Sequence, residues 1–460
     1  MKNKFFGVVI ACIFSGLKMQ AQWTLSNVTT YSAQIQWEAQ AGVSGYLVVR
    51  SGDGNIEFPI DPAGYQKGDY IGADQVAYVG SANSFTQKNL RASSHYEFMV
   101  FPYFLNNGVY NFIEVPFPNL LLDTPYNMMG DYYVDVDSTQ AGFVADLQER
   151  VRNPYVKIAY NSYDETMIAN YAAVDTANGQ SVVECVYSEF HYVYTPPFDW
   201  LPISREHTYC HSWMPSYSST STDEYADQHH LFPTQQNNAN GVRSNHPLGE
   251  VETVQSSFLQ GKLGLNEDNQ VVYEPRDEQK GDAARALLYM SLRYDGLDGL
   301  DWTFDRLNMI TLPSLSEAPQ SLALLLQWHF QDLPDAFERG RNDYIQSIQQ
   351  NRNPFIDHPY WVNYIRFEDL TYIEPVVIQD NFRSQWLLLN NGENPTLVGD
   401  GIDQIVCCEW FNLTGEKVSS RGMQNEVSLH NESLASGLFY ARLTLKDGSS
   451  VVLPWWVNKD

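Results

Sequence analysis

Positive charge is scarce in this sequence. Its 460 residues hold 28 Lys and Arg against 55 Asp and Glu, which gives a formal net charge of 28 − 55 = −27. A broad nucleic-acid-binding surface needs many Lys and Arg side chains, because its affinity comes from neutralising phosphates. The charge balance excludes such a surface. A polyanion is therefore a partner only through a local site or a bound cation.

Long apolar runs and cysteine motifs are also lacking. After the first 22 residues no stretch approaches the roughly 18 uncharged apolar residues that cross a bilayer, so we expect no stable membrane insertion. The five cysteines form no C-x-x-C motif, which argues against a thiolate zinc site. A disulfide between Cys185 and Cys210 stays open, whereas a bridge between the adjacent Cys407 and Cys408 would be strained.

The composition itself is that of folded domains. Hydrophobic residues make up 43% and aromatic residues 14%, while only 18% are charged, so extensive disorder is excluded. The first 22 residues carry Lys2 and Lys4, then an apolar run at 5–17, then Ala21, which is the pattern of a secretory signal peptide. We therefore expect a secreted protein, extracellular or on the cell surface.

Hydrophobic periodicity divides the rest of the chain into three parts. Residues 23–124 alternate apolar and polar positions between turns, which predicts an all-β sandwich. Residues 125–368 show helical periodicity at 141–152, 163–174, 282–293, 319–329 and 335–350, with a strand at 179–187, which predicts an α+β domain. Residues 369–391 read as a linker. Residues 392–460 alternate again and predict a small all-β domain.

The two flanking parts each resemble a known module. Trp37 on an early strand, with Leu90 six residues before Tyr96, is similar to the core Trp and tyrosine corner of fibronectin type III domains. In the tail, a turn at 412–415 and Ser436-Gly437 before an apolar strand resemble the C-terminal sorting domain of the type IX secretion system. That second resemblance implies the secretion machinery as a partner.

The densest group of potential ligands lies in the central part. Six of the ten histidines fall between His191 and His246, beside Glu206 and several asparagines. Carboxylate and amide oxygens suit Mg²⁺, and a neighbouring neutral imidazole can take a proton from water, which together describe a phosphodiesterase. A zinc hydrolase is the alternative, with imidazoles supplied by His207, His211, His229 and His230, although no His-Glu-x-x-His motif supports it.

Five motifs follow one another through residues 131–365. They are Arg205-Glu206-His207 with Ser212-Trp213, then 227–233, then 240–245, then 274–277 with 280–285, and Arg341-Asn342 with 349–358. In this order they resemble the endonuclease I family of secreted and periplasmic nucleases, a branch of the His-Me finger (ββα-metal) nucleases. The resemblance implies a metal-dependent endonuclease that hydrolyses DNA, RNA or both.

The resemblance also implies roles for particular residues. Glu206 and Asn240 would hold Mg²⁺, and His207 would be the general base that activates water. The loop before Asn240 is longer than usual, so Asn237 stays an alternative ligand. Asn240 is favoured because it keeps the three-residue step to Arg243.

Some members of the endonuclease I family have a phosphate-binding arginine between the motif that holds the histidine and the motif that begins with the aspartate. This sequence has no arginine between His207 and Asp227, so the resemblance does not place that residue. Arg205, Arg243 and Arg285 are the candidates. A rival hypothesis from another class is a secreted binding or adhesion protein whose nuclease fold has lost its activity. The intact Glu206, His207 and Asn240 argue against it.

Overall fold

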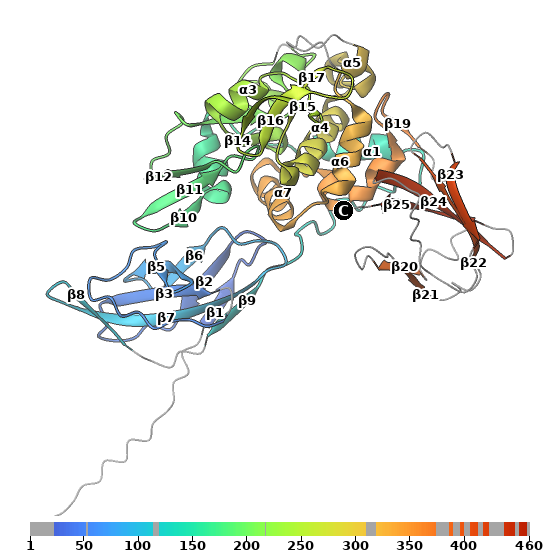
Figure 1. The fold of residues 1–460 in the computed structure, drawn as a ribbon. Helices are drawn as coiled ribbons and strands as arrows, with labels where there is room; N and C mark the ends of the chain where they lie inside the picture. The colour runs from blue at the N-terminus through green and yellow to red at the C-terminus, as the bar shows by residue number, and fades with distance from the viewer. Residues whose placement is uncertain are drawn as a thin grey trace, which may run out of the picture.

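The computed structural model describes residues 23–51, 54–113, 119–216, 218–309 and 319–373, and the segments 386–389, 396–399, 405–412, 417–422, 437–446 and 450–457. An all-β N-terminal region, a mixed α/β central region and a β-rich C-terminal part follow one another, in the order that the hydrophobic periodicity predicts (Figure 1). No helix among the described residues is long and apolar enough to cross a membrane. The predicted signal peptide lies outside the described residues.

The N-terminal region is a sandwich of two antiparallel sheets. One sheet has the order β1 (Trp23–Ser26), β2 (Ala33–Trp37), β6 (Ser84–Gln87). The other has the order β4 (Tyr70–Ile71), β5 (Asp74–Gly80), β3 (Gly45–Ser51), β7 (His95–Asn106), β8 (Val109–Phe112), and β9 (Leu120–Asp123) also pairs with β7. The buried positions of β2 alternate, as expected for a strand with one face on a core.

The residues singled out in the sandwich are core residues. Trp37 is 1% exposed and packs edge-on against Trp23 and Tyr46, with ring centroids 5.9 and 5.3 Å away. Leu90 is fully buried. The Tyr96 hydroxyl accepts a hydrogen bond of 2.8 Å from the Arg91 backbone N–H, which is the geometry of the predicted tyrosine corner.

Helices form the main core of the central region. They are α1 (Phe143–Arg152), the π-helical segment η2 (Asp164–Ala172), α2 (Asp223–Ala226), α4 (Lys280–Tyr294), α5 (Phe304–Met309), α6 (Leu322–Gln331), α7 (Ala336–Gln349) and α8 (Pro354–Asp357). The five helices expected from periodicity are all present, with ends within three residues of those predicted. Helix α4 is buried along almost its whole length, because α1, α6 and α8 pack around it.

Short antiparallel sheets complete this region. They are β10 (Val174–Thr176), β11 (Gln180–Glu184) and β12 (His191–Tyr194); β13 (Ile203–His207) with β14 (Leu231–Gln235); β15 (Thr253–Phe258), β16 (Gly261–Leu265) and β17 (Val271–Glu274); and β18 (Ile365–Arg366) with β19 (Thr371–Tyr372). Only β11 was expected from the sequence pattern alone. Cys185 and Cys210 are both buried free thiols, so the disulfide left open is not formed.

The C-terminal part contains two further sheets. The strands β20 (Trp386–Leu389) and β21 (Thr396–Gly399) pair with each other, and a four-stranded sheet has the order β23 (Lys417–Gly422), β22 (Ile405–Phe411), β24 (Gly437–Leu445), β25 (Ser450–Val457). Residues 413–416 and Ser436, on which the sorting-domain resemblance partly rests, lie outside the described residues.

The sandwich contacts the central region through polar and aromatic groups. The Thr30 hydroxyl donates to Asp343 Oδ2 over 2.7 Å, and both side chains are buried. Tyr31 packs edge-on against Tyr344, with ring centroids 5.2 Å apart. On the adjoining sheet, Gln75 Nε2 donates to the carbonyl oxygen of Asp175 over 2.8 Å. The two regions are therefore joined by direct packing and hydrogen bonds as well as by the connecting chain.

Candidate active site

A β-hairpin followed by a helical segment brings the predicted residues together. Strands β13 and β14 pair so that Glu206 lies opposite Phe232 and His207 opposite Leu231. The chain then turns into the π-helical η5 (Gln236–Asn240) and the short α3 (Gly241–Arg243). This return places the Asn240 amide against the Glu206 carboxylate, where Nδ2 donates to Oε2.

Glu206 is the buried centre of this arrangement. Its residue is 3% exposed, and its Oε1 accepts hydrogen bonds from Arg243 Nη1 at 2.8 Å and from the Tyr187 hydroxyl at 3.1 Å. Burial raises the pKa of the Glu206 carboxyl to about 7, and Arg243 only partly offsets that effect. The carboxyl group thus sits where more positive charge would stabilise its ionised form.

Arg243 is fully buried and holds Glu206 in place. Besides the 2.8 Å ion pair with Glu206, its guanidinium donates to the carbonyl oxygens of His207 at 3.1 Å and Thr208 at 2.8 Å. The guanidinium also lies over the Trp213 ring, 5.1 Å from its centroid. Its donors point into the protein interior, so the contacts of Arg243 are those of a positioning residue.

His207 presents a neutral imidazole with a defined tautomer. Its Nε2 lies 3.0 Å from the carbonyl oxygen of Tyr225. A carbonyl oxygen only accepts hydrogen bonds, so Nε2 carries the proton and Nδ1 carries the lone pair. Burial, and next the nearby His230, hold the pKa of His207 well below its usual range. The ring is therefore uncharged at neutral pH and available to accept a proton.

The remaining histidines of the cluster have separate partners. The Nε2 atoms of His211, His229 and His230 lie 3.1, 3.4 and 2.8 Å from three different backbone carbonyl oxygens. Within the described parts of the chain, no group of three or more His, Cys, Asp or Glu side chains could hold a metal ion. The geometry therefore gives no support to the zinc alternative.

The other predicted residues lie in different environments. Asn237 is exposed on η5, one turn before Asn240. Arg285 is fully buried on α4, where it pairs with Glu338 at 2.6 Å and Asp282 at 2.9 Å. It thereby ties α4 to α7. Arg205 is partly exposed on β13, on the same face as His207, because strand side chains alternate between faces.

A buried hydrogen-bond network braces the loop that leads into β14. The Asp227 carboxylate accepts from the hydroxyls of Tyr289 at 2.8 Å and Tyr294 at 2.9 Å, and from Gln349 Nε2 at 2.9 Å. Arg341 Nη2 donates over 2.8 Å to the carbonyl oxygen of Leu231, the first residue of β14. Residues of α4 and α7 thus hold the start of β14 in place through buried hydrogen bonds.

Several residues of the site escaped the sequence analysis. Tyr225, Tyr160 and Trp200 contact His207 or Arg205, and Tyr187 contacts Glu206. Residues 187–200 contain six Tyr, Phe and Trp residues, namely Tyr187, Phe190, Tyr192, Tyr194, Phe198 and Trp200. The density of aromatic residues in this segment was the sequence feature that could have indicated Tyr187 and Trp200.

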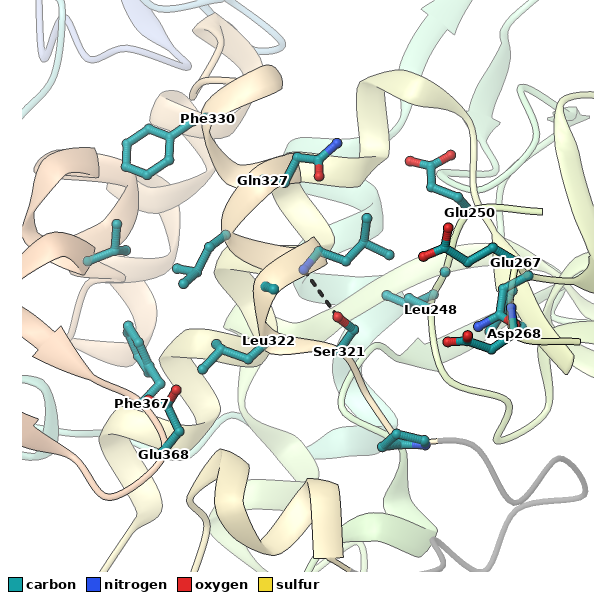
Figure 2. A pocket seen from close by; sticks show the side chains of 18 of the residues that line it. Leu248, Glu250, Glu267, Asp268, Ser321, Leu322, Gln327, Phe330, Phe367 and Glu368 are labelled. Carbon is teal, nitrogen blue, oxygen red and sulfur yellow. Dashed lines mark hydrogen bonds between the residues drawn. The ribbon is translucent and has the colours of Figure 1, made fainter. Parts of the chain in front are cut away.

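One cavity of the described part of the chain lies away from these residues. A cavity of about 1020 Å³ runs along α6 and reaches Tyr440 of β24. Figure 2 shows Glu250, Glu267, Asp268 and Glu368 around it, with Phe330 and Leu322 on the side of α6. Such a concentration of carboxylates repels phosphates, so the cavity is unsuited to a polyanion.

Comparison with known proteins gives this geometry its context. Residues 145–360, which include Glu206, His207 and Asn240, match the family model described as Endonuclease I. An extracellular ribonuclease of Bacillus amyloliquefaciens is 36% identical over 172 residues, which are 36% of this chain and 54% of the relative. A periplasmic deoxyribonuclease of Aeromonas hydrophila is 28% identical over 131 residues, which are 28% of this chain and 47% of the relative.

The chain spans about half the length of the curated relatives it matches. Among solved structures, the fibronectin type-III domain of a human fibronectin type III domain containing protein aligns with 25% of this chain and 89% of that chain, at 22% identity and a TM-score of 0.17. The N-terminal sandwich is defined by its own strand pairing and core.

Proposed function

We propose that the protein is a secreted, Mg²⁺-dependent endonuclease of the His-Me finger type that hydrolyses phosphodiester bonds in DNA, RNA or both. The observation that carries the proposal is that one hairpin-helix unit holds a neutral His207, with Nδ1 unprotonated, and a buried Glu206 carboxylate bonded to the partly exposed Asn240. The match of residues 145–360 to Endonuclease I supports it. The relatives bear both ribonuclease and deoxyribonuclease names, which is why both substrates are kept.

The residues present fit Mg²⁺. Glu206 offers a carboxylate and Asn240 an amide, and hard oxygen donors of this kind bind Mg²⁺ together with water and substrate phosphate oxygens. Burial is the main cause of the raised pKa of Glu206, and a divalent cation beside the carboxylate would stabilise its ionised form. When bound, Mg²⁺ would stabilise negative charge on the phosphate and on the departing O3′.

The side chains of the chain carry the proton transfer and the positioning. His207 Nδ1 takes a proton from the attacking water, while its Nε2–H stays bonded to the Tyr225 carbonyl and keeps the ring oriented. Arg243 fixes Glu206 from the interior side. Arg205, which shares the strand face of His207, is the arginine we assign to a phosphate oxygen of the substrate, because Arg243 and Arg285 are fully buried.

A degradation assay tests the proposal. Purified protein should convert supercoiled plasmid and long RNA to shorter products in Mg²⁺, and EDTA should stop the reaction. His207→Ala should lower the rate by about 10²–10⁴-fold with an unchanged melting temperature, since removal of a general base has that typical effect. Activity of this variant within a few-fold of wild type would remove His207 from the mechanism.

Export is part of the same proposal. We assign residues 1–22 to a signal peptide and 392–460 to a sorting domain read by the type IX secretion machinery, so that the enzyme acts outside the cell. The extracellular and periplasmic names of the relatives support an exported protein. Fractionation of the native host, with an antibody to the central region, would show the protein in the medium or on the surface.

A further inference from the structure

An arginine held between two aromatic rings lies beside the proposed general base. The Arg205 guanidinium carbon is 4.1 Å from the centroid of the Tyr160 ring and 4.3 Å from that of the Trp200 ring. Its Nη1 donates to the Tyr160 carbonyl oxygen over 2.9 Å. The Tyr160 ring also stacks on His207, with centroids 5.5 Å apart and planes 16° from parallel. Starting from His207, the planar groups of Tyr160, Arg205 and Trp200 therefore pack one against the next.

The aromatic series continues beyond Trp200. Phe198 meets the Trp200 ring edge-on at 4.8 Å, and Tyr192 lies 5.8 Å from Phe198. Tyr160, Tyr192, Phe198 and Trp200 are all partly exposed. Each also packs against the buried cluster that contains Tyr163 and Tyr194. The rings are thus anchored in the core, while part of each ring stays exposed to solvent.

The charge of the chain indicates which form of nucleic acid this aromatic surface would bind. Duplex nucleic acid keeps its bases stacked inside, so a protein without base readout binds it chiefly by neutralising phosphates. This chain has a net charge of −27, and Arg243 and Arg285 are buried and paired with carboxylates. Unpaired nucleotides, in contrast, expose the faces of their bases to aromatic side chains, and stacking on those side chains adds affinity without a further phosphate contact.

We propose that Tyr160, Arg205 and Trp200 form a platform in which the exposed part of the Trp200 ring stacks on unpaired nucleotides next to the scissile phosphate, and that the enzyme therefore cleaves single-stranded nucleic acid in preference to duplex. The proposal rests on the nuclease function proposed above and adds the substrate class. The platform acts in binding: its rings hold the strand and Arg205 meets a phosphate, while His207 performs the proton transfer.

The test compares matched single-stranded and duplex oligonucleotides of one sequence. Trp200→Ala should lower kcat/KM on the single strand by about tenfold, mainly through KM, since stacking on one aromatic residue typically accounts for a factor of about 5 to 150. Duplex cleavage should fall less than single-strand cleavage, because it loses only the support that Trp200 gives to Arg205. Trp200→Phe should keep most of the single-strand activity. Tyr360→Ala, at a 55% exposed aromatic residue on η8 (Pro359–Tyr364), is the matched control and should change neither rate.

Binding without turnover separates this inference from the nuclease proposal. Fluorescence anisotropy of a labelled single strand with His207→Ala protein in EDTA should show binding that Trp200→Ala weakens. A slope of log K against log salt shallower than about −2 is expected, which corresponds to at most about three phosphate contacts. The wild type failing to cleave any substrate would refute the nuclease function alone.

Other outcomes refute the platform and leave the nuclease in place. They are equal loss of single-strand and duplex cleavage in Trp200→Ala, a wild-type preference for duplex, or a salt slope as steep as that of a protein with six or more phosphate contacts, about −4 or beyond for a single strand. The salt slope is measured on protein with Trp200 intact, so it decides the question even where Trp200→Ala does not fold.

Discussion

Arg243 and Arg205 lie on either side of Glu206 and provide a matched test of two different roles. Arg243 is fully buried, with a 2.8 Å ion pair to Glu206 and two bonds to carbonyl oxygens. Arg205 is partly exposed, with a single bond to a carbonyl oxygen and two ring contacts. Replacing each with Met removes the charge and keeps an unbranched side chain. We expect Arg243→Met to affect folding and Arg205→Met to affect substrate binding.

The magnitudes follow from burial. Removing one partner of a buried ion pair leaves an uncompensated charge and costs about 3–5 kcal/mol of unfolding free energy. At about 2–4 °C per kcal/mol for a domain of 150–250 residues, Arg243→Met should lower the melting temperature by about 6–20 °C. The two cation–π contacts of Arg205 contribute about 1–2 kcal/mol together, so Arg205→Met should lower it by about 2–8 °C.

Thermal unfolding followed by tryptophan fluorescence, together with KM and kcat on one oligonucleotide, distinguishes the two roles. Arg205→Met should raise KM in a protein that is folded at the assay temperature. Arg243→Met should lose activity together with stability, because Glu206 loses its anchor. An Arg243→Met protein that melts at the wild-type temperature but has a raised KM would refute the reasoning, since that is the behaviour of a phosphate ligand.

Three further predictions concern other parts of the chain. Asn240→Ala should raise the Mg²⁺ concentration needed for half-maximal activity while Asn237→Ala should not, and the opposite result would reassign the ligand. Thr30→Val, which keeps the shape but removes the donor to the Asp343 carboxylate, should reduce unfolding free energy by about 1.5–3 kcal/mol in urea titrations; an unchanged midpoint would mean that the sandwich is not coupled to the central region. Deleting 392–460 should leave the purified enzyme's rate unchanged yet stop its export from the native host, and a folded truncated protein without activity would contradict this.

The elements that the sequence predicted correctly are those whose core face repeats at a regular spacing. In α1 the buried residues Phe143, Val144, Leu147 and Val151 form a single stripe, so the spacing of apolar residues in the sequence predicts the helix. Strand β15 was missed because five of its six residues are exposed, and backbone pairing with β16 defines it. The π-helical character of η2, with bonds such as Ala173 N–H to the Ile168 carbonyl at 2.9 Å, leaves no mark on the hydrophobic spacing.

Within the candidate site, spacing and family resemblance placed Glu206, His207 and Asn240 on one unit, and the fold does bring Asn240 to Glu206. The choice among the arginines could not be made in the same way. Arg205 and Arg243 are the same residue type near the same glutamate, and only the tertiary packing turns one toward solvent and the other toward the interior. The aromatic partners of His207 are Tyr160, which precedes it by 47 residues, and Tyr225, which follows it by 18, so adjacency in sequence gives no sign of them.

The arrangement of the hairpin explains why the site needs so much support from distant residues. Glu206 and His207 are neighbours on β13, so their side chains point to opposite faces, one into the buried pair with Asn240 and the other toward Tyr225. A slip of one residue in the pairing of β13 with β14 would exchange the two faces and destroy both functions. The network around Asp227 and the bond from Arg341 to the Leu231 carbonyl fix where β14 begins, and so fix that register. Substitutions at Arg341 or Gln349 should therefore impair a reaction whose substrate they never touch.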